Sequence, residues 1–359
     1  MPQQPRLFTP LKIRDVEFRN RVFVSPMCQY SSEDGLPNDW HLVHLGSRAV
    51  GGAALVLAEA TAVTPDGRIS PSDLGIWSDA HAEALRPIAR FIRKQGAAAG
   101  IQIAHAGRKA STAPPWDGGG AVAPDRGGWT PVGPSPEPFG PNSPTPHELT
   151  AGEIERLVEQ FGDATRRARE AGFDVVEIHA AHGYLLHEFL SPLTNLRTDR
   201  FGGDFERRLA FPLAVVSRVR EVWPATQPLF MRISATDWVE GGWSIGDSIA
   251  LARRLKVLGV DLIDCSSAGA VSHAKIPVGP GYQAPLAAAV RQGAEIATGA
   301  VGLVTSPEQA EQILSTGQAD AVLLARELLR NPYWPLMAAR RLGASVEWPK
   351  QYLRASPGR

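Results

Sequence analysis

The sequence predicts a single (β/α)₈ barrel, an α/β fold in which parallel strands alternate with helices. Short apolar runs that suit strands buried on both faces alternate along the chain with amphipathic, helix-like segments. No G-x-G-x-x-G motif follows the first strand-like run, which disfavours the alternative of a doubly wound sheet. We therefore expect one domain, residues 1–359, because barrels with insertions reach this length.

The strand-like runs are short and rich in Val, Ile, Leu and Ala. Such runs are typical of strands that helices cover on one face and the barrel interior covers on the other. We place eight of them at residues 21–24, 54–58, 99–103, 175–179, 229–233, 262–265, 300–303 and 321–324.

The intervening helices carry start and stop signals. Thr150, followed three residues later by Glu153, forms a capping-box pattern, and Gly172 suits the end of that helix. The segment 306–317 begins with Ser-Pro and ends with Gly. Residues 205–223 and 243–259 have similar helical patterns.

Two segments depart from this alternation. Residues 7–21 read as a short hairpin before the first unit, which we expect to plug the floor of the barrel. Residues 113–148, after the third strand, are dense in Pro and Gly. A long loop on the side where barrels keep their active sites predicts a lid, and a floppy surface insertion is the alternative.

Bulk composition excludes several functions. Lys and Arg number 37 against 37 Asp and Glu, so no basic field for nucleic acid is expected. Only Cys28 and Cys265 are present, too few for an iron–sulfur or Cys₄ zinc site, and a reducing cytoplasm is expected. No apolar run is long enough to span a membrane, and no secretory signal is recognisable.

Polar residues at the carboxyl ends of barrel strands are the first candidates for a site. Among them His179, His182 and Tyr184 follow one apolar run directly. Two imidazole N–H groups can hold a carbonyl oxygen and polarise a conjugated C=C bond, and a tyrosine hydroxyl can deliver a proton. H-x-x-H is also a metal-pair pattern or a structural pair, although no clear third metal ligand follows. His187 and Glu188, on the next helix, receive no role.

The remaining strand ends predict an anion site. Arg232 closes an apolar strand as a lone cation, which requires either an electron-rich ligand or a structural ion pair. Arg326 follows the eighth strand and Gly302 the seventh, where barrels commonly bind phosphate. Glycine there lets backbone N–H groups approach the phosphate closely.

Motifs along nearly the whole chain resemble the Old Yellow Enzyme family, in particular its bacterial thermophilic-like subclass. The residues that carry the resemblance are 8–10, 20–21, SPMCQY at 25–30, QIAHAGRK at 102–109, EIHAAHGY at 177–184, LSPLTN at 190–195, RTDRFGG at 197–203, Arg232, Gly302, LAR at 324–326 and YLR at 352–354.

The resemblance implies an FMN at the carboxyl mouth of the barrel, with Arg232 near flavin N1 and Arg326 at the phosphate. The cofactor contacts it implies are Ser25, Pro26, Met27, Cys28, Ala60, Gln102, Arg232, Gly302, Ala325 and Arg326. Ala325 is a departure, because many relatives have Gly before the phosphate arginine.

The resemblance also implies roles on the substrate side. His179 and His182 bind the substrate carbonyl or nitro group and the nicotinamide carboxamide, Tyr184 donates the proton, and Tyr30 supplies a further hydroxyl. In this subclass an arginine near the C-terminus enters the neighbouring subunit's site, and Arg354 in the tail 344–359 matches it, which implies a homodimer or homotetramer.

The expected function is that of an ene-reductase, in which NADPH, or NADH, reduces an activated C=C bond of an enone or nitroalkene through FMN. A non-catalytic flavin-binding stress protein and a barrel lyase that uses Lys109 or Lys275 are the alternatives. A larger dienoyl-CoA reductase is disfavoured by the lack of a Cys-rich iron–sulfur segment.

Overall fold

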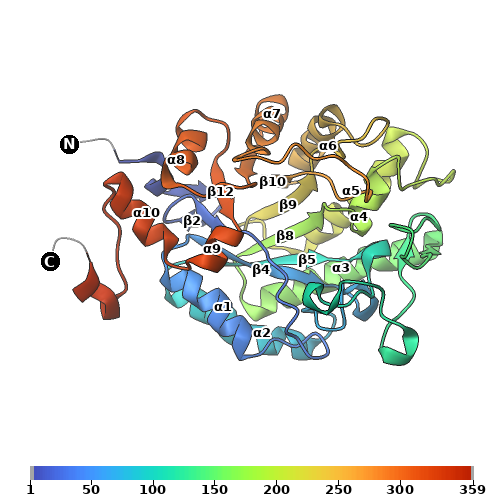
Figure 1. The fold of residues 1–359 in the computed structure, drawn as a ribbon, viewed down its shortest axis with the longest axis horizontal. Coiled ribbons are helices and arrows are strands. Elements are labelled where there is room, and N and C mark those ends of the chain that lie inside the picture. The colour runs from blue at the N-terminus through green and yellow to red at the C-terminus, as the bar shows by residue number, and fades with distance from the viewer. Residues whose placement is uncertain (1–3, 357–359) are drawn as a thin grey trace.

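The structure, a computed structural model, describes residues 4–356. At its centre is a closed barrel with the strand order β10-β11-β12-β3-β4-β5-β8-β9, and helices surround it (Figure 1). Every neighbouring pair of barrel strands is parallel. The predicted (β/α)₈ barrel is therefore confirmed, and the carboxyl ends of its strands meet at one mouth.

The barrel strands follow the predicted runs closely, with one exception described below. Their bounds are β3 (Val22–Val24), β4 (Leu55–Ala62), β5 (Ala98–Ala104), β8 (Val175–Ala180), β9 (Leu229–Ser234), β10 (Leu262–Ser266), β11 (Ala297–Ala300) and β12 (Ala321–Leu324).

The seventh strand was placed wrongly, at residues 300–303. The strand ends at Ala300, where it pairs with Cys265 of β10 and Val322 of β12. Beyond it, Gly302 and Leu303 have φ values of 117° and 51°, which no strand can accommodate. The apolar residues 301–303 therefore belong to the turn that leaves the barrel mouth.

The helices begin and end largely where capping residues predict. Helix α3 (Ala151–Ala171) has the expected capping box between Thr150 and Glu153, and Gly172 ends it at φ 87°. The other helices are α1 (Asp39–Val50), α2 (Asp79–Lys94), α4 (Leu185–Leu190), α5 (Phe205–Val222), α6 (Ile245–Val257), α7 (Ala284–Ala294), α8 (Pro307–Ser315), α9 (Arg326–Arg330) and α10 (Trp334–Leu342).

An antiparallel hairpin, β1 (Leu11–Ile13) and β2 (Val16–Phe18), precedes the barrel. The buried Phe18 ring lies 4.9 Å from the ring of Phe23 in β3 and 6.3 Å from that of Phe230 in β9. Apolar contacts with residues from several barrel strands anchor the hairpin. A hairpin that plugs the barrel floor would make such contacts. That this hairpin closes the floor stays a prediction.

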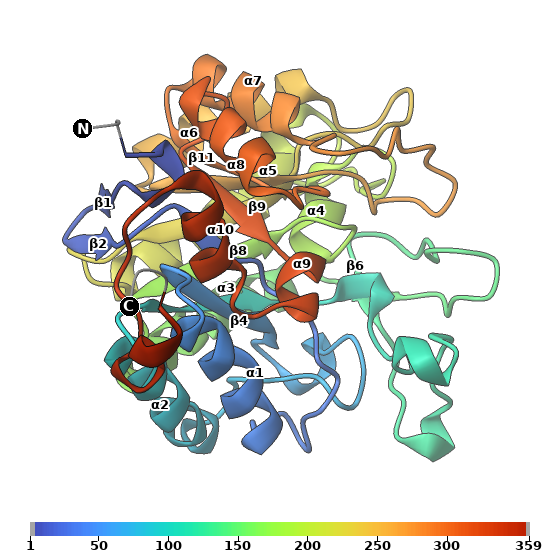
Figure 2. The same cartoon turned by 60° about the vertical axis from the view of Figure 1, so that its left-hand side comes forward.

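The segment 113–148 projects from the mouth side of the barrel (Figure 2). It contains two 3₁₀ turns, Pro115–Asp117 and Pro124–Arg126, and two short strands, β6 (Val132–Gly133) and β7 (His147–Glu148). Its backbone is tied down, because the amide of Trp129 donates to the Ser111 hydroxyl and the indole of Trp129 to the carbonyl of Asp66. The fold of this segment is compatible with the predicted lid, which stays a prediction.

The C-terminal tail packs at the opposite end of the molecule from the segment 113–148 (Figure 1). A 3₁₀ segment, Lys350–Ala355, places the Tyr352 hydroxyl 3.4 Å from that of Tyr333. Separately, among residues 4–356 we find no helix with the length and apolar character needed to cross a bilayer.

Candidate active site

Strand β8 and the turn after it bring His179, His182 and Tyr184 together at the barrel mouth. The ring centroid of His179 lies 5.2 Å from that of His182 and 4.9 Å from that of Tyr184, and both ring pairs are perpendicular. The cluster predicted from sequence spacing thus exists as one constellation, although the roles assigned to it stay predictions.

Both imidazoles are held in the neutral form. Burial, reinforced by the positive charge of Arg232, holds the pKa of His179 and of His182 well below the ordinary value. The Ala181 amide donates to Nδ1 of His179 over 3.2 Å, which leaves the proton of that ring on Nε2. His179 therefore has an N–H to offer a ligand, while Nε2 of His182 lies 2.6 Å from the Ser266 hydroxyl.

The loop after β3 contributes the opposite wall of this constellation. Cys28, Tyr30 and Tyr184 pack against one small apolar cluster made by Ile69, Ala106 and Ala110. Burial raises the pKa of each of these two phenols and of the Cys28 thiol. Tyr184 thus keeps its proton at neutral pH, as a proton donor must.

Arg232 makes the ion pair that sequence reasoning weighed as its structural alternative. Its Nε lies 3.1 Å from Oδ2 of Asp264, and its Nη1 donates to the Ser25 hydroxyl over 3.0 Å. The neighbouring strands β4, β5 and β8 bring Ala60, Gln102 and Glu177 into register, and Gln102 donates to Glu177 over 2.8 Å. Burial and the nearby Asp264 raise the pKa of Glu177 to about 8.

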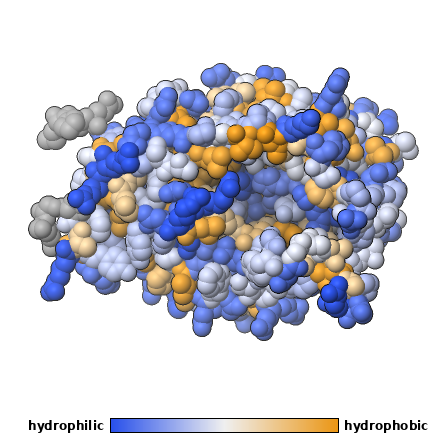
Figure 3. Space-filling model, viewed as in Figure 1, coloured by the Kyte–Doolittle hydropathy of each residue, from blue (hydrophilic) through white to orange (hydrophobic). Residues whose placement is uncertain are grey.

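One cavity of about 170 Å³ joins Arg232 to the phosphate candidates. The buried Arg232 forms its inner end, and Gly302, Ala325 and the exposed Arg326 line the remainder together with Arg330. A recess is visible near the middle of the face in Figure 3. The cavity has one cation at its inner end and others along the remainder of its wall. It therefore suits an elongated ligand that has an electron-rich end and an anionic end.

The backbone conformations of two small residues in the cavity wall decide whether a Cβ is tolerated at each. Gly302 has φ 117°. A Cβ placed on it would lie 2.9 Å from the side-chain Nε2 of Gln283 and 3.0 Å from the Tyr282 ring. Only glycine fits there without strain. Ala325 has φ −107°, outside the left-handed region, so its methyl group meets no backbone penalty of that kind.

Residues 6–344 match the NADH:flavin oxidoreductase / NADH oxidase family. The chain belongs to this family. It is the Old Yellow Enzyme family that the sequence motifs resemble, and its members are oxidoreductases that use FMN. The reading as a barrel lyase is therefore wrong.

Individual relatives agree with this assignment over their full length. The chain is 51% identical to an NADPH dehydrogenase of Geobacillus sp. (strain WCH70), over 97% of this chain and 98% of the relative. It is 47% identical to an NADPH dehydrogenase of Bacillus subtilis (strain 168), over 97% and 98%. Morphinone reductase superposes with a TM-score of 0.79 at 29% identity, over 97% of this chain and 92% of that chain.

The residues of the family's cofactor site fit FMN in this chain. Arg326 and Arg330 offer positive charge to the phosphate, and Gly302 lets the backbone come close to it. Arg232 has Asp264 on one edge and faces the cavity as well, so the ion pair and the ligand contact are compatible. Ser25 directly follows β3, where its amide donates to the Leu324 carbonyl of β12, and Ala60 and Gln102 are partners on the neighbouring strands β4 and β5.

Sequence reasoning missed three polar groups beside this site. Lys109 was considered only as the amine of a barrel lyase, but its Nζ donates to the His182 carbonyl over 2.7 Å. His187 and Glu188 were given no role, yet both are fully buried, and Glu188 accepts the amide of Arg108. Burial raises the pKa of Glu188 to about 8 and lowers that of Lys109 to about 8. The sequence did contain a signal for two of these groups: a His-Glu pair inside an otherwise apolar helix is expected to be buried, and buried charged residues are rare without a partner.

The structure does not bring Arg354 to the site of its own chain. Arg354 is exposed on the tail, at the end of the molecule away from the segment 113–148 (Figure 1). Across residues 4–356 no third His, Cys, Asp or Glu joins His179 and His182 in a group that could hold a metal ion.

Proposed function

We propose that the protein is an ene-reductase that uses NADPH to reduce the activated C=C bond of α,β-unsaturated carbonyl or nitro compounds. The observation that carries the proposal is the pair of neutral, perpendicular imidazoles beside the protonated Tyr184. His182 contacts Ser266, which also lines the cavity with Arg232 and Arg326. The names of the relatives support NADPH as the reductant.

The chain's own residues bind and polarise the substrate. FMN, when bound, supplies the hydride chemistry by accepting hydride from NADPH and passing it to the β-carbon of the substrate. His179, whose ring proton is on Nε2, donates that N–H to the carbonyl or nitro oxygen, and His182 binds the same oxygen. These contacts strengthen as negative charge develops on that oxygen during hydride addition.

Tyr184 completes the reaction by giving its phenolic proton to the α-carbon. Hydride at the β-carbon and a proton at the α-carbon balance the saturated product, and solvent returns the proton to Tyr184. Burial keeps the phenol protonated until the enolate forms, because the pKa of Tyr184 is raised well above its ordinary value. NADPH and substrate use the same imidazoles in turn, so ping-pong kinetics are expected.

A substrate panel tests the proposal. The FMN-loaded protein, reduced with NADPH under anaerobic conditions, is mixed with cyclohexenone, a maleimide, a nitroalkene, cyclohexanone and an unconjugated alkene. The first three should reoxidise the protein and yield saturated products, since only they have a C=C bond conjugated to an oxygen-bearing group that the imidazoles can bind. Equal reaction with the unconjugated alkene, or none with any activated compound, would contradict the function.

We also propose that two subunits complete each site, with Arg354 reaching the neighbour. Helices α1, α9 and α10 and the tail each expose large apolar side chains, namely Trp40, Val43, Leu329, Met337 and Tyr352. Burial of these side chains against a second copy fits a homodimer or homotetramer. A reducing cytoplasm, proposed from the two free cysteines, suits this enzyme.

Mixing two variants with different defects tests the shared site. Arg354→Ala should raise the KM for enones without loss of FMN, and Tyr184→Phe should lose proton donation. After subunit exchange, a mixed dimer has one site with both Tyr184 and the partner's Arg354, so about a quarter of all sites should recover. Activity no greater than the mean of the two separate variants would show that Arg354 serves its own chain or neither.

A further inference from the structure

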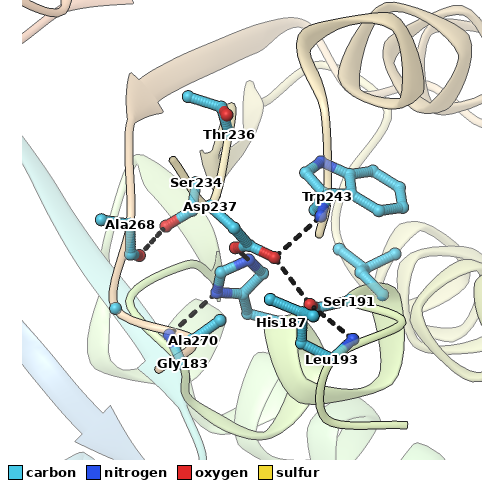
Figure 4. A network of polar contacts seen from close by, with 12 residues as sticks. Gly183, His187, Ser191, Leu193, Ser234, Thr236, Asp237, Trp243, Ala268 and Ala270 are labelled. Carbon is cyan, nitrogen blue, oxygen red and sulfur yellow. Dashed lines mark hydrogen bonds and ion pairs between the residues drawn. The ribbon is translucent and has the colours of Figure 1, made fainter. Parts of the chain in front are cut away.

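The peptide group between His182 and Gly183 is held at both of its polar atoms. The Gly183 N–H donates to Nδ1 of His187 over 2.9 Å, and the His182 carbonyl accepts from Nζ of Lys109 over 2.7 Å. Figure 4 shows the imidazole of His187 on α4 directed at the Gly183 amide. Both partners come from outside the turn, so the peptide has little freedom to rotate.

This peptide lies at the centre of the turn that carries the carbonyl-binding imidazole and the proton donor. His182 and Gly183 have φ values of 60° and 73°, and the Tyr184 amide closes the turn by donating to the Ala181 carbonyl. Two central residues with positive φ are the signature of a type I′ turn. A different orientation of the central peptide would turn the side chains of His182 and Tyr184 in other directions.

His187 is itself fixed in one tautomer. Because Nδ1 accepts the Gly183 N–H, the ring proton is on Nε2, which lies 3.1 Å from Oδ1 of Asp237. That contact is short but poorly aligned for a hydrogen bond, so its attraction is mainly electrostatic. His187 and Asp237 are both buried from solvent.

Asp237 is anchored on its other oxygen. Oδ2 accepts the Ser191 hydroxyl over 2.6 Å and the Trp243 amide over 2.8 Å (Figure 4). Burial alone would raise the pKa of Asp237, but the contacts with His187, Ser191 and Trp243 bring it below the ordinary value. A carboxylate that stays ionised keeps the Nε2 proton of His187 in place.

We propose that His187, oriented by Asp237, is a positioning residue that sets the distance between the His182 ring and the Tyr184 hydroxyl by holding the His182–Gly183 peptide. The inference rests on the function proposed above, because that function assigns carbonyl binding to His182 and proton donation to Tyr184, the two residues that the turn carries. His187 reaches the substrate only through this peptide.

Two substitutions at residue 187 separate its two contacts. In His187→Asn the side-chain amide oxygen of the new residue can lie near the former Nδ1 position and accept the Gly183 N–H, while the contact with Asp237 is lost. In His187→Gln the amide reaches the Nε2 position and Asp237, while the acceptor for Gly183 is lost. Trp223→Phe is a matched control, since it removes a buried bond from the indole to the Pro228 carbonyl, far from the turn.

The measurements are FMN content, thermal unfolding, the rate of reduction by NADPH, the rate of reoxidation by cyclohexenone, and binding of p-hydroxybenzaldehyde. His187→Gln should slow reoxidation on the order of tenfold or more relative to Trp223→Phe, since a misplacement of about 1 Å can cost on the order of 100-fold. His187→Asn should stay within about threefold of the wild type, given that it keeps the bond. Equal reoxidation rates for the two variants would overturn the proposal.

Asp237→Asn provides a second test with almost no change in volume. Ser191 and Trp243 both donate to the position of Oδ2, so the amide oxygen should settle there and its NH₂ should face Nε2 of His187. His187 would then have its proton on Nδ1 and could not accept the Gly183 N–H. We expect the selective slowing seen in His187→Gln, and a normal reoxidation rate would overturn the proposal.

The wild-type protein distinguishes failure of this inference from failure of the proposed function. If the wild type binds FMN and turns over cyclohexenone, while every variant matches Trp223→Phe, His187 is a structural residue only and the positioning role is refuted. If the wild type is not reoxidised by cyclohexenone, the proposed function itself fails, and the positioning role fails with it.

Discussion

Replacing Tyr184 with Phe is expected to slow reoxidation by weakly activated enones about 10²- to 10⁴-fold, the usual contribution of a general acid. The phenol is partly buried, keeps its proton, and lies with its ring 4.9 Å from that of His179. Reduction by NADPH needs no proton from Tyr184 and should change little. Stopped-flow measurement of the two half-reactions separates these effects.

Tyr333→Phe is the control for loss of a tyrosine hydroxyl. Tyr333 lies between α9 and α10, where its hydroxyl contacts that of Tyr352, and its variant should keep both half-reactions. Strongly activated substrates such as maleimides should be less sensitive to Tyr184→Phe, because solvent can protonate the product after hydride transfer. A Tyr184→Phe protein in which both half-reactions fall equally would remove Tyr184 as the proton donor.

Replacing both His179 and His182 with Ala is expected to weaken phenol binding about 10²- to 10⁴-fold. Two hydrogen bonds to a charged oxygen contribute about 1.5–3 kcal/mol each, and every 1.4 kcal/mol is about tenfold in affinity. FMN content should be retained, since the residues proposed for its phosphate, Arg326 and Gly302, line a cavity that includes neither His179 nor His182. Titration with p-hydroxybenzaldehyde, followed by its long-wavelength charge-transfer band, measures the affinity.

His81→Ala controls for loss of a buried imidazole. His81 lies in α2, where its ring contacts the Ser78 hydroxyl and the Asp34 carbonyl, and it has no part in the proposed site. Its variant should lose stability but bind the phenol normally. Unchanged phenol affinity in the double variant of His179 and His182 would end the assignment of these residues to the substrate oxygen.

Local sequence signals were sufficient for most of the barrel. Strand runs and helix caps are short-range properties, and the capping box of Thr150 and Glu153 forms as predicted because both residues lie within one turn. Likewise His179, His182 and Tyr184 come together because they follow a single strand and its turn. The seventh strand failed because the apolar residues after Ala300 gave no sign of the left-handed turn at Leu303.

The remaining features of the site depend on contacts between distant segments. Asp264 pairs with Arg232 only because β9 and β10 are neighbours in register, which no short motif reveals. Lys109 reaches the His182 carbonyl across 73 residues of sequence, and Asp237 meets His187 from another strand-end loop. Such partners can be found once the order of strands in the barrel is known, since all their loops share one mouth.

The most direct test of the account is an anaerobic titration of the FMN-loaded protein, first with NADPH and then with cyclohexenone. The account predicts that NADPH bleaches the visible flavin band, that cyclohexenone restores it, and that cyclohexanone forms in proportion to the NADPH consumed. A protein that stays colourless after incubation with FMN, or a bleached band that cyclohexenone does not restore, would contradict it.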